Sequence, residues 1–434
     1  MMVLRCGLLA TILLVSGCGG GSLDLSGKPS DGGGGSTPEV PSDSLILARS
    51  DSPYADKLIP CVLGLQANNA CSLNELNFIY QATPNPTVED IMNRVVVSDI
   101  WMARRFEEML KHPNMPNTML PLFQSVRAVV ISKDIRPAFF SLYSGAIYLD
   151  PDFIWLTNAE KATINKDEDA RAEFARQFDF LATQRFVKNN ARAFPAGTLS
   201  DRTERSLAAT VPLLASLLFH ELAHARDAYH STFLDTLTPS DTRLSDIFQN
   251  RTIKVMNQQL FVDTFALTDK NMKSLSQALY GGQTPTAEQK AYTAAEVGAM
   301  LEGEGANDQY AYYTGYEDFA MLFEETMMKY HYNIDRDVVY LEVPDELTKC
   351  DDYVVGWGQR NRIAASEVRP RAQMVARKAL ANISGNELLE IDAFFSRLGS
   401  PTSLPLIGYC SSINPNSRSL SDSQFDPRLD SIRY

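Results

Sequence analysis

Hydrophobic and polar residues follow a helical period over several long stretches of the chain. Residues 87–112 open with a threonine suited to a helix N-cap, carry acids in their first turn and continue as an amphipathic pattern, which predicts one helix. The same period favours helices at five further places, 167–194, 201–229, 314–332, 366–382 and 385–397. We therefore expect a mainly helical protein.

Several short runs are instead rich in β-branched and aromatic residues, which is typical of strands. Three of them are separated by Pro137 and Gly145 and predict one small sheet, formed by residues 126–132, 139–144 and 146–150. Two others, 335–343 and 353–358, are expected to be extended. The chain has no internal repeat, and the fold class that these patterns predict is α+β.

The first 17 residues have the pattern of a secretory signal peptide, with a basic Arg5 and an apolar stretch that is too short to span a bilayer as a mature helix. Small residues directly ahead of Cys18 resemble the bacterial lipobox, in which the cysteine becomes the lipidated N-terminus. The alternative is a plain signal peptide that is cleaved nearby. Residues 18–43 are rich in Gly, Ser and Pro, which predicts a disordered tether.

The predicted location follows from this anchor. Gly19, and not Asp, comes after Cys18, which resembles the export signal to the outer membrane of Gram-negative bacteria. We expect a protein of the bacterial cell envelope that is attached to the membrane by its lipid and faces the periplasm or the cell surface. No later segment has the length and apolar character of a transmembrane helix.

Charge and cysteine content narrow the partners and the compartment. The net charge of −13 argues against nucleic acid as a partner, because phosphates attract basic surfaces. Four cysteines remain in the exported body, where disulfides persist. Of the three possible pairings, we expect the one between near neighbours in the chain, Cys61–Cys71 and Cys350–Cys410.

The strongest chemical signal is the stretch HELAH at residues 220–224. Histidines four apart on a helix lie about 40° apart around its axis, so His220 and His224 project from one face and can reach the same ion. Neutral imidazoles are good ligands of Zn²⁺, and Glu221 is placed to act on water at the metal without being a ligand. The chain has five histidines in 434 residues, so a chance arrangement is a weak alternative. We expect one zinc ion per chain.

A catalytic zinc site needs a third protein ligand. The helix predicted over residues 314–332 offers Glu317 in its first turn, with Glu324 and Glu325 two turns later. Two histidines on one helix and a glutamate on a second helix form the ligand set of gluzincin peptidases. The alternative is that these acids cap and solvate a surface helix.

Other positions also stay open for the third ligand. His230 lies near the place of the last histidine in the metzincin pattern, but on an unbroken helix it would point about 120° away from His224, and no glycine supplies a bend. Glu304 and Asp308 reproduce a spacing found in some gluzincins, although two neighbouring glycines disfavour a helix there.

The stretches HELAHARDAYH and QYAYYTGYEDFA resemble the catalytic domain of the anthrax lethal factor-type gluzincin peptidases. The resemblance implies a set of site residues by position: His220, His224 and Glu317 as metal ligands, Glu221 as general base, Asp227 as a support of the ligand histidines, and Tyr310 as a donor to the substrate. The chain departs from the family at Met321, where an acid is often found, and in the long gap between the two motifs.

The resemblance also implies a fold and a division of the chain. We expect a zincin-like metallopeptidase core over residues 201–345, with the HExxH helix as its active-site helix. An N-terminal helical region with the small sheet, residues 44–200, would precede it, and a C-terminal helical region, residues 346–434, would follow.

On the residues alone, two of these roles have alternatives. Tyr310 is one of four tyrosines in the stretch YAYYTGY, all of which suit packing at the start of a helix. Asp227 lies one turn beyond His224 and can fix the tautomer of a ligand imidazole, but an exposed acid or an ion pair with Arg226 fits the sequence as well.

The predicted function is hydrolysis of peptide bonds in a peptide or protein substrate, with Glu221 taking a proton from a zinc-activated water and passing it to the leaving amine. Two other classes stay in view, a catalytically inactive zincin-fold lipoprotein that acts as a binding or assembly factor of the envelope, and a zinc hydrolase of non-peptide substrates. The intact HExxH favours an enzyme, because an inactive site would be free to lose Glu221.

Overall fold

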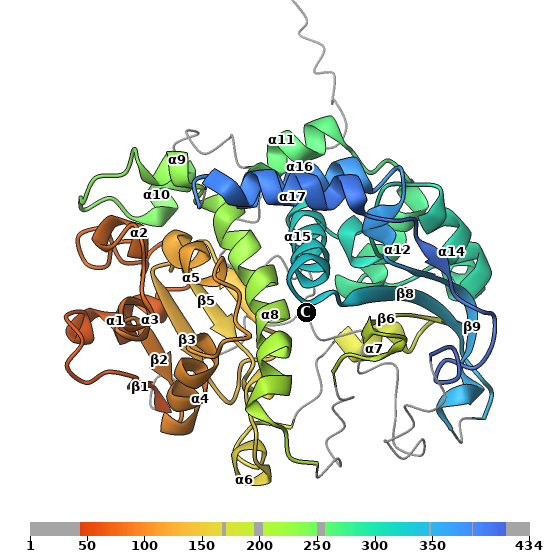
Figure 1. Cartoon of the computed structure of the whole chain (residues 1–434), viewed down its shortest axis with the longest axis horizontal. Helices are drawn as coiled ribbons and strands as arrows, with labels where there is room; N and C mark the ends of the chain where they lie inside the picture. Colours follow the sequence, from red (N-terminus) through yellow and green to blue (C-terminus); the bar gives the residue numbers. More distant parts are fainter. Residues whose placement is uncertain are drawn as a thin grey trace, which may run out of the picture.

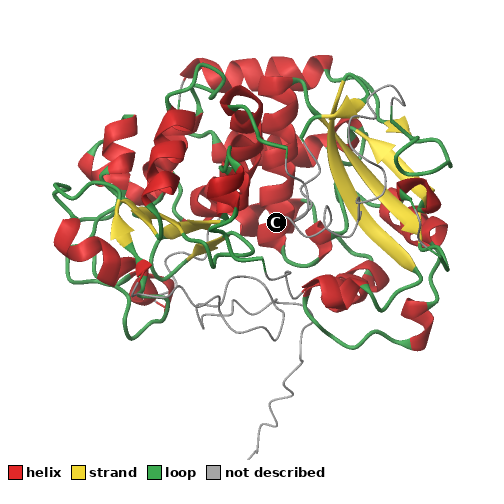
Figure 2. Cartoon of the chain, turned by 90° about the horizontal axis from the view of Figure 1, so that it is seen from below, coloured by secondary structure: helices red, strands yellow, loops and turns green. Residues whose placement is uncertain are grey.

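Two long helices, α8 (Leu207–Ala228) and α15 (Gly315–Tyr332), lie side by side in the middle of the molecule, with a small β-sheet on either side of them (Figure 1). The view from below shows the same arrangement (Figure 2). The prediction of an α+β fold is therefore confirmed. The computed structural model describes residues 44–166, 171–194, 203–249, 257–346, 349–383 and 385–413. The predicted signal peptide, Cys18 and the tether lie outside these residues.

The first sheet contains the three strands predicted from residues 126–150, together with two others. Its order is β1 (Ile46–Leu47), β2 (Val95–Val97), β3 (Ala128–Ile131), β5 (Ala146–Leu149) and β4 (Phe139–Ser141). The three central strands pair in parallel, and the two edge strands are antiparallel to their neighbours. Successive side chains of β3 enter apolar clusters on opposite faces of the sheet, which explains why its sequence is continuously apolar.

The prediction of one helix over residues 87–112 is wrong. The segment forms helix α3 (Val88–Met92), then β2, then helix α4 (Ile100–Leu110). Thr87 caps α3 as expected, but Asp99 caps a second helix. The three valines of β2 are β-branched and pair with β3, so the buried sheet is favoured over a continuous helix.

The second sheet is antiparallel throughout and includes both extended segments predicted after residue 334. Its order is β10 (Thr402–Ser403), β9 (Val354–Arg360), β8 (Asp335–Glu342), β6 (Phe180–Lys188) and β7 (Ala191–Arg192). These strands come from all three predicted regions of the body. The sheet therefore runs across the boundaries expected at residues 200 and 345.

The prediction of a helix over residues 167–194 is wrong for most of this segment. Only the short helix α7 (Arg171–Ala175) lies in its described part, and β6 and β7 follow. Phe180 of β6 enters one apolar cluster and Leu181 enters another, which is the two-residue period of a strand. Residues such as Ala, Arg and Gln suit a helix, but pairing of β6 with β8, far along the chain, overrides that preference.

The remaining helices surround these layers. They are α1 (Ala55–Val62), α2 (Ile79–Ala82), α5 (Met119–Leu122), α6 (Asn158–Lys161), α9 (Ser231–Leu234), α10 (Leu244–Gln249), α11 (Asn257–Thr264), α12 (Lys270–Tyr280), α13 (Ala287–Lys290), α14 (Ala294–Glu302), α16 (Arg369–Ala379) and α17 (Gly385–Arg397). Short 3-10 turns are η2 (Phe123–Ser125), η3 (Pro151–Phe153), η4 (Tyr310–Tyr312), η5 (Cys350–Asp352) and η6 (Arg362–Ala364). The helices predicted near residues 366–382 and 385–397 are confirmed as α16 and α17, which cross the upper ends of α8 and α15 in Figure 1.

The two central helices confirm the predictions for residues 201–229 and 314–332. Phe219 of α8 meets Phe323 of α15 edge to face, with ring centroids 6.0 Å apart. The prediction that no later segment has the length and apolar character of a transmembrane helix is wrong for α8, which within the described part of the chain is the one helix that meets both criteria. However, 72% of its most apolar window is buried inside the protein. Such burial is expected of a helix at the centre of a core.

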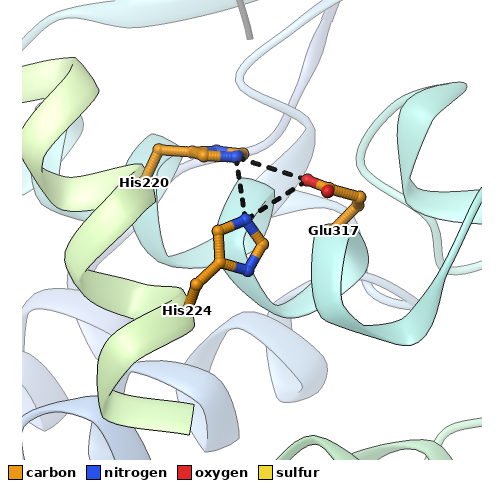
Figure 3. A group of neighbouring side chains, drawn as sticks. All are labelled: His220, His224 and Glu317. Atoms are coloured by element: carbon orange, nitrogen blue, oxygen red, sulfur yellow. Dashed lines mark hydrogen bonds and ion pairs between the residues drawn. The ribbon is translucent and has the colours of Figure 1, made fainter. Parts of the chain in front are cut away.

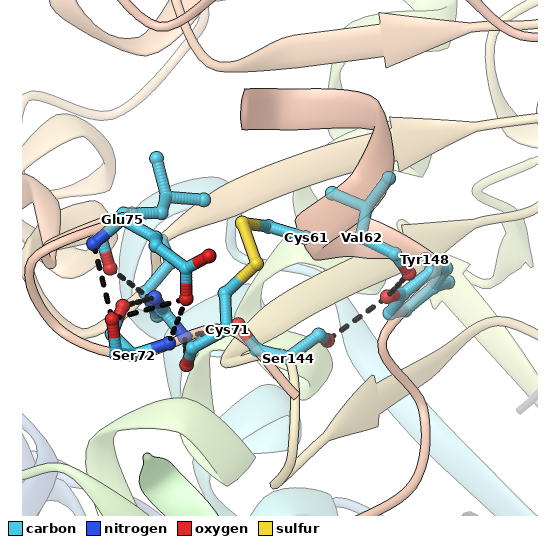
Figure 4. Close-up of a disulfide and its surroundings, with 9 residues drawn as sticks. Cys61, Val62, Cys71, Ser72, Glu75, Ser144 and Tyr148 are labelled. Atoms are coloured by element: carbon cyan, nitrogen blue, oxygen red, sulfur yellow. Dashed lines mark hydrogen bonds between the residues drawn. A yellow bond between two sulfur atoms is a disulfide. The ribbon is translucent and has the colours of Figure 1, made fainter. Parts of the chain in front are cut away.

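Both predicted disulfides are confirmed. Cys61–Cys71 joins the end of α1 to the loop that follows it, and Cys350–Cys410 joins η5 to the segment after β10. Figure 4 shows the first bond, close to Tyr148 of β5. The two bonds close loops of different length, since their cysteines are 10 and 60 residues apart.

The longer loop predicts the larger contribution to stability. Loop-closure entropy gives about 4 kcal/mol for Cys350–Cys410 and about 3 kcal/mol for Cys61–Cys71. Replacing Cys350 and Cys410 by serine should therefore lower the free energy of unfolding more than replacing Cys61 and Cys71. Urea unfolding under non-reducing conditions measures both, and a larger loss for the Cys61–Cys71 variant would contradict the prediction.

Candidate metal centre

Three side chains that the sequence indicates as metal ligands point toward one another between α8 and α15 (Figure 3). His220 and His224 lie one turn apart on α8, and Glu317 lies in the first turn of α15. Thr314 is the N-cap of α15 and accepts a hydrogen bond from the backbone N–H of Glu317. The start of this helix, and with it the place of the glutamate, is therefore defined by a local signal.

The first turn of α15 is also held by its neighbours. Asp318 forms a buried ion pair with Arg371 of α16, in which Nη2 lies 2.5 Å from Oδ2 and Nη1 lies 3.2 Å from Oδ1. Arg371 donates further hydrogen bonds to the carbonyls of Gly305 and Phe265. Glu317 therefore belongs to a turn that several segments of the chain hold in place.

The distances between the donor atoms match a tetrahedral metal site. His220 Nε2 lies 3.2 Å from His224 Nε2 and 3.3 Å from Glu317 Oε2, and His224 Nε2 lies 3.5 Å from the same oxygen. Ligand atoms bound to zinc at 2.0–2.1 Å in a tetrahedron are about 3.3 Å from one another. Two imidazoles and a carboxylate are also donor types that zinc prefers, so these residues fit the ion and leave one corner for water or substrate.

The site is buried, with none of the three residues more than 9% exposed. Burial lowers the pKa of His220, but its interactions with the carboxylates of Glu317 and Glu324 outweigh this and raise the pKa to about 10. Burial lowers the pKa of His224, and it favours the neutral form of Glu317, whose pKa the two histidines nevertheless hold well below its usual range. Metal binding at this site would compete with protons for the imidazole nitrogens, because only a neutral imidazole binds a metal ion.

Glu221 follows His220 on α8 and is 2% exposed. Its negative charge contributes to the raised pKa of His220, so its carboxylate lies near that ring. It does not belong to the group formed by the three donor atoms. A carboxylate beside the ligands that is not itself a ligand has the placement that a general base requires.

A further group of buried charges lies on the Nδ1 side of the His220 ring. Glu324 Oε2 is 3.8 Å from His220 Nδ1 and 3.8 Å from Arg336 Nη1, and Arg336 Nη2 is 3.1 Å from Asp308 Oδ2. Arg336 could not be predicted from the sequence, because a single arginine in a strand carries no signal of its own. Glu221, Glu317 and Glu325 are also buried in this region, so carboxylates outnumber this guanidinium, an excess that a divalent cation would offset.

Among the described residues, the other candidate ligands do not join the group formed by the two Nε2 atoms and Glu317, and Glu324 lies on the Nδ1 side of His220 instead. Glu325 Oε2 accepts a hydrogen bond from Asn307 Nδ2 at 3.1 Å. His230 lies beyond the end of α8 and caps α9 through its Nδ1. Glu304 accepts hydrogen bonds from the backbone and hydroxyl of Thr268 ahead of α12. Glu317 is therefore the acid of this set whose oxygen lies within 3.5 Å of both Nε2 atoms.

Tyr310 lies in an aromatic cluster next to the start of α15. Its ring is stacked on Tyr313 with centroids 5.8 Å apart, and Tyr280 lies against it at 4.7 Å. The cluster includes Met321, one turn beyond the proposed ligand glutamate. The hydroxyl of Tyr310 is 3.5 Å from Arg171 Nη1. The position is close to the ligand helix, and the role of Tyr310 as a donor to the substrate stays a prediction.

Asp227 is completely buried on α8, so the alternative of an exposed acid is wrong. It lies one turn beyond His224 on the same helix. The pKa of Tyr316 is raised mainly by burial of its ring and, second, by the negative charge of Asp227. The neighbouring Arg226 donates to the carbonyls of Ala379 and Ala381. The support that Asp227 would give to a ligand histidine stays a prediction.

The region between α8 and α15 thus offers three donors for one transition-metal ion, with a further carboxylate next to them. The three donors and Glu221 are all carried by the two long central helices, α8 and α15. Comparisons of the chain with models of protein families, with curated proteins and with solved structures found no match.

Proposed function

We propose that the protein is a zinc-dependent peptidase. The observation that carries the proposal is the tetrahedral spacing of His220 Nε2, His224 Nε2 and Glu317 Oε2, with Glu221 next to them. The resemblance of the two sequence motifs to the lethal factor-type gluzincins supports the same roles. A zinc ion held by these three side chains would act as a Lewis acid, which polarises a substrate carbonyl and makes water a nucleophile near neutral pH.

The residues of the chain supply the proton transfers and the orientation. Glu221 takes a proton from the attacking water and delivers it to the leaving nitrogen, so that a C–O bond forms as the C–N bond breaks. Burial of the site strengthens these interactions by excluding bulk water. We assign Tyr310, by resemblance, to the donor that stabilises the negative charge on the carbonyl oxygen.

We also propose that the two central helices and the second sheet form a zincin-like core. In it α8 is the active-site helix and α15 brings the third ligand. Because β6 and β9 belong to the same sheet as β8, this core extends beyond residues 201–345 on both sides.

Cleavage of a quenched fluorescent peptide library and of a denatured protein tests the proposal. Purified protein with one zinc ion per chain should cleave them, lose activity with a chelator and regain it when zinc is added. Turnover of ester or small amide substrates without peptide cleavage would identify a non-peptide hydrolase. Zinc binding with no turnover would favour the binding or assembly factor, and absence of zinc binding would remove the proposal altogether.

We further propose that Cys18 carries the lipid that anchors the protein in the cell envelope. Cys18→Ser should move the protein from the membrane fraction to the soluble fraction, because a cysteine thiol is the acceptor of the lipid. Immunoblots of fractionated cells measure the distribution, and labelling with a radioactive fatty acid checks the modification. Unchanged membrane association of the variant would contradict the anchor.

A further inference from the structure

Glu324 is a completely buried carboxylate on the far side of the His220 ring from the donor atoms. It lies two turns beyond Glu317 on α15, and its Oε2 is 3.8 Å from His220 Nδ1. The opposite nitrogen of the same ring, Nε2, faces Glu317 Oε2 at 3.3 Å. One helix therefore places a carboxylate next to each of the two nitrogens of this imidazole.

An imidazole that binds a metal through Nε2 carries its proton on Nδ1, and a carboxylate facing Nδ1 fixes both this tautomer and the orientation of the ring. From this geometry we infer that Glu324 is a positioning residue for His220. The inference rests on the proposed zinc site. Glu324 would contact neither the ion nor the substrate and would act through the ligand His220.

The charge of Glu324 is in turn balanced from β8. Arg336 is completely buried, and its Nη1 lies 3.8 Å from Glu324 Oε2 while its Nη2 lies 3.1 Å from Asp308 Oδ2. The same guanidinium is therefore shared between two buried acids. A positive charge at this place offsets part of the cost of burying the Glu324 side chain in the core.

The surroundings of Glu324 differ from those of an acid with a structural role. Within the described residues, neither of its oxygens accepts a hydrogen bond. Its neighbour Glu325, which is also buried, accepts hydrogen bonds from Asn307 Nδ2 at 3.1 Å and from the Ile363 backbone N–H at 3.4 Å. Glu325 thus ties α15 to two other segments, whereas Glu324 faces the ligand histidine and Arg336.

The pair Glu324→Gln and Glu325→Gln gives a matched test, because both replace a buried glutamate on α15 by its neutral isostere. We expect Glu324→Gln to weaken zinc binding about 10- to 100-fold, the loss typical of removing a partner of a ligand histidine. Glu325→Gln should leave the zinc affinity within about threefold of the wild type, because Glu325 contacts Asn307 and the Ile363 backbone and no ligand histidine. Competition with a chromophoric chelator measures the affinity without reference to turnover.

Two further measurements separate positioning from a merely structural effect. Glu324→Met, in which an apolar side chain of similar size replaces the carboxylate, should fold, because such replacements of buried charges are often neutral or stabilising. It should bind zinc more weakly than Glu324→Gln, whose amide oxygen would still present a partial negative charge to Nδ1 of His220. The visible spectrum of the Co²⁺-loaded protein, which reports ligand orientation, should change in both variants and stay the same in Glu325→Gln.

The outcomes distinguish this inference from the proposed function. A wild-type protein that binds no zinc would remove both. Suppose instead that the wild type binds zinc, and that Glu324→Gln and Glu324→Met both keep the zinc affinity and the cobalt spectrum of the wild type. This result would overturn the role of Glu324 and leave the zinc site intact.

Discussion

Glu221→Gln is expected to lower kcat for peptide cleavage by about 10²- to 10⁴-fold, the usual contribution of a general acid–base residue. The substitution keeps the shape of the side chain but removes its ability to take a proton. Glu221 is buried next to His220 and is not one of the three donors, so the variant should still bind one zinc ion per chain. Steady-state cleavage of a peptide substrate and metal analysis of the same samples measure the two effects.

The control for this change is Glu325→Gln, which alters another buried glutamate without touching the proposed chemistry. It should leave kcat close to the wild-type value. If Glu221→Gln retained substantial activity at full zinc content, the assignment of the proton transfers to Glu221 would be wrong. If it lost its zinc, Glu221 would act as a ligand and not as a base.

The second large effect is expected for Glu317→Ala, which should weaken zinc binding by about 10²- to 10³-fold. Structural zinc in zinc-finger peptides is bound with about 10–16 kcal/mol in total, which corresponds to several kcal/mol for each ligand. The two histidines that remain would hold the ion weakly. Metal content after dialysis against a mild chelator, together with a competition titration, measures the loss.

Two controls make this result specific. His230→Ala removes the cap of α9 and should cost about 1 kcal/mol of stability, but it should not change zinc affinity. Glu304→Ala removes an acid that binds the backbone near α12 and should also leave zinc binding unchanged. A variant Glu317→Ala that kept its zinc, beside a His230→Ala that lost it, would replace the gluzincin ligand set by a metzincin-like one.

The features that were predicted correctly are those with a local physical cause. A threonine followed by an acid-rich first turn predicts the start of α15, because the cap satisfies free backbone N–H groups in its own first turn. Each disulfide joins two cysteines that follow one another in the sequence, Cys61 with Cys71 and Cys350 with Cys410. Strands β3 and β5 of the first sheet were visible because a buried parallel strand needs a continuous apolar run.

The two wrong predictions concern segments whose local preference does not decide their structure. Residues 167–194 are rich in helix-forming residues, yet β6 forms there because β8 offers a partner with a matching pattern of buried positions. In residues 87–112 a strand of three valines interrupts the helical period, because β3 is available for parallel pairing. Both partners are distant in sequence, and a single-sequence pattern carries no information on which distant strands will meet.

The sequence by itself determined the pair His220 and His224, because a helical period of 3.6 residues places positions i and i+4 on one face wherever that helix lies. Only the tertiary structure decided which acid faces them. Glu317, Glu324 and Glu325 all lie on α15. The rotation of this helix against α8 turns Glu317 toward Nε2 of His220 and Glu324 toward Nδ1 of the same ring. Glu325 is turned toward Asn307. That rotation is set by contacts between whole elements, such as the packing of aromatic rings between α8 and α15 and the guanidinium that β8 brings to the second acid. These contacts involve segments far apart in the chain, so they arise only when the helices and the second sheet pack together.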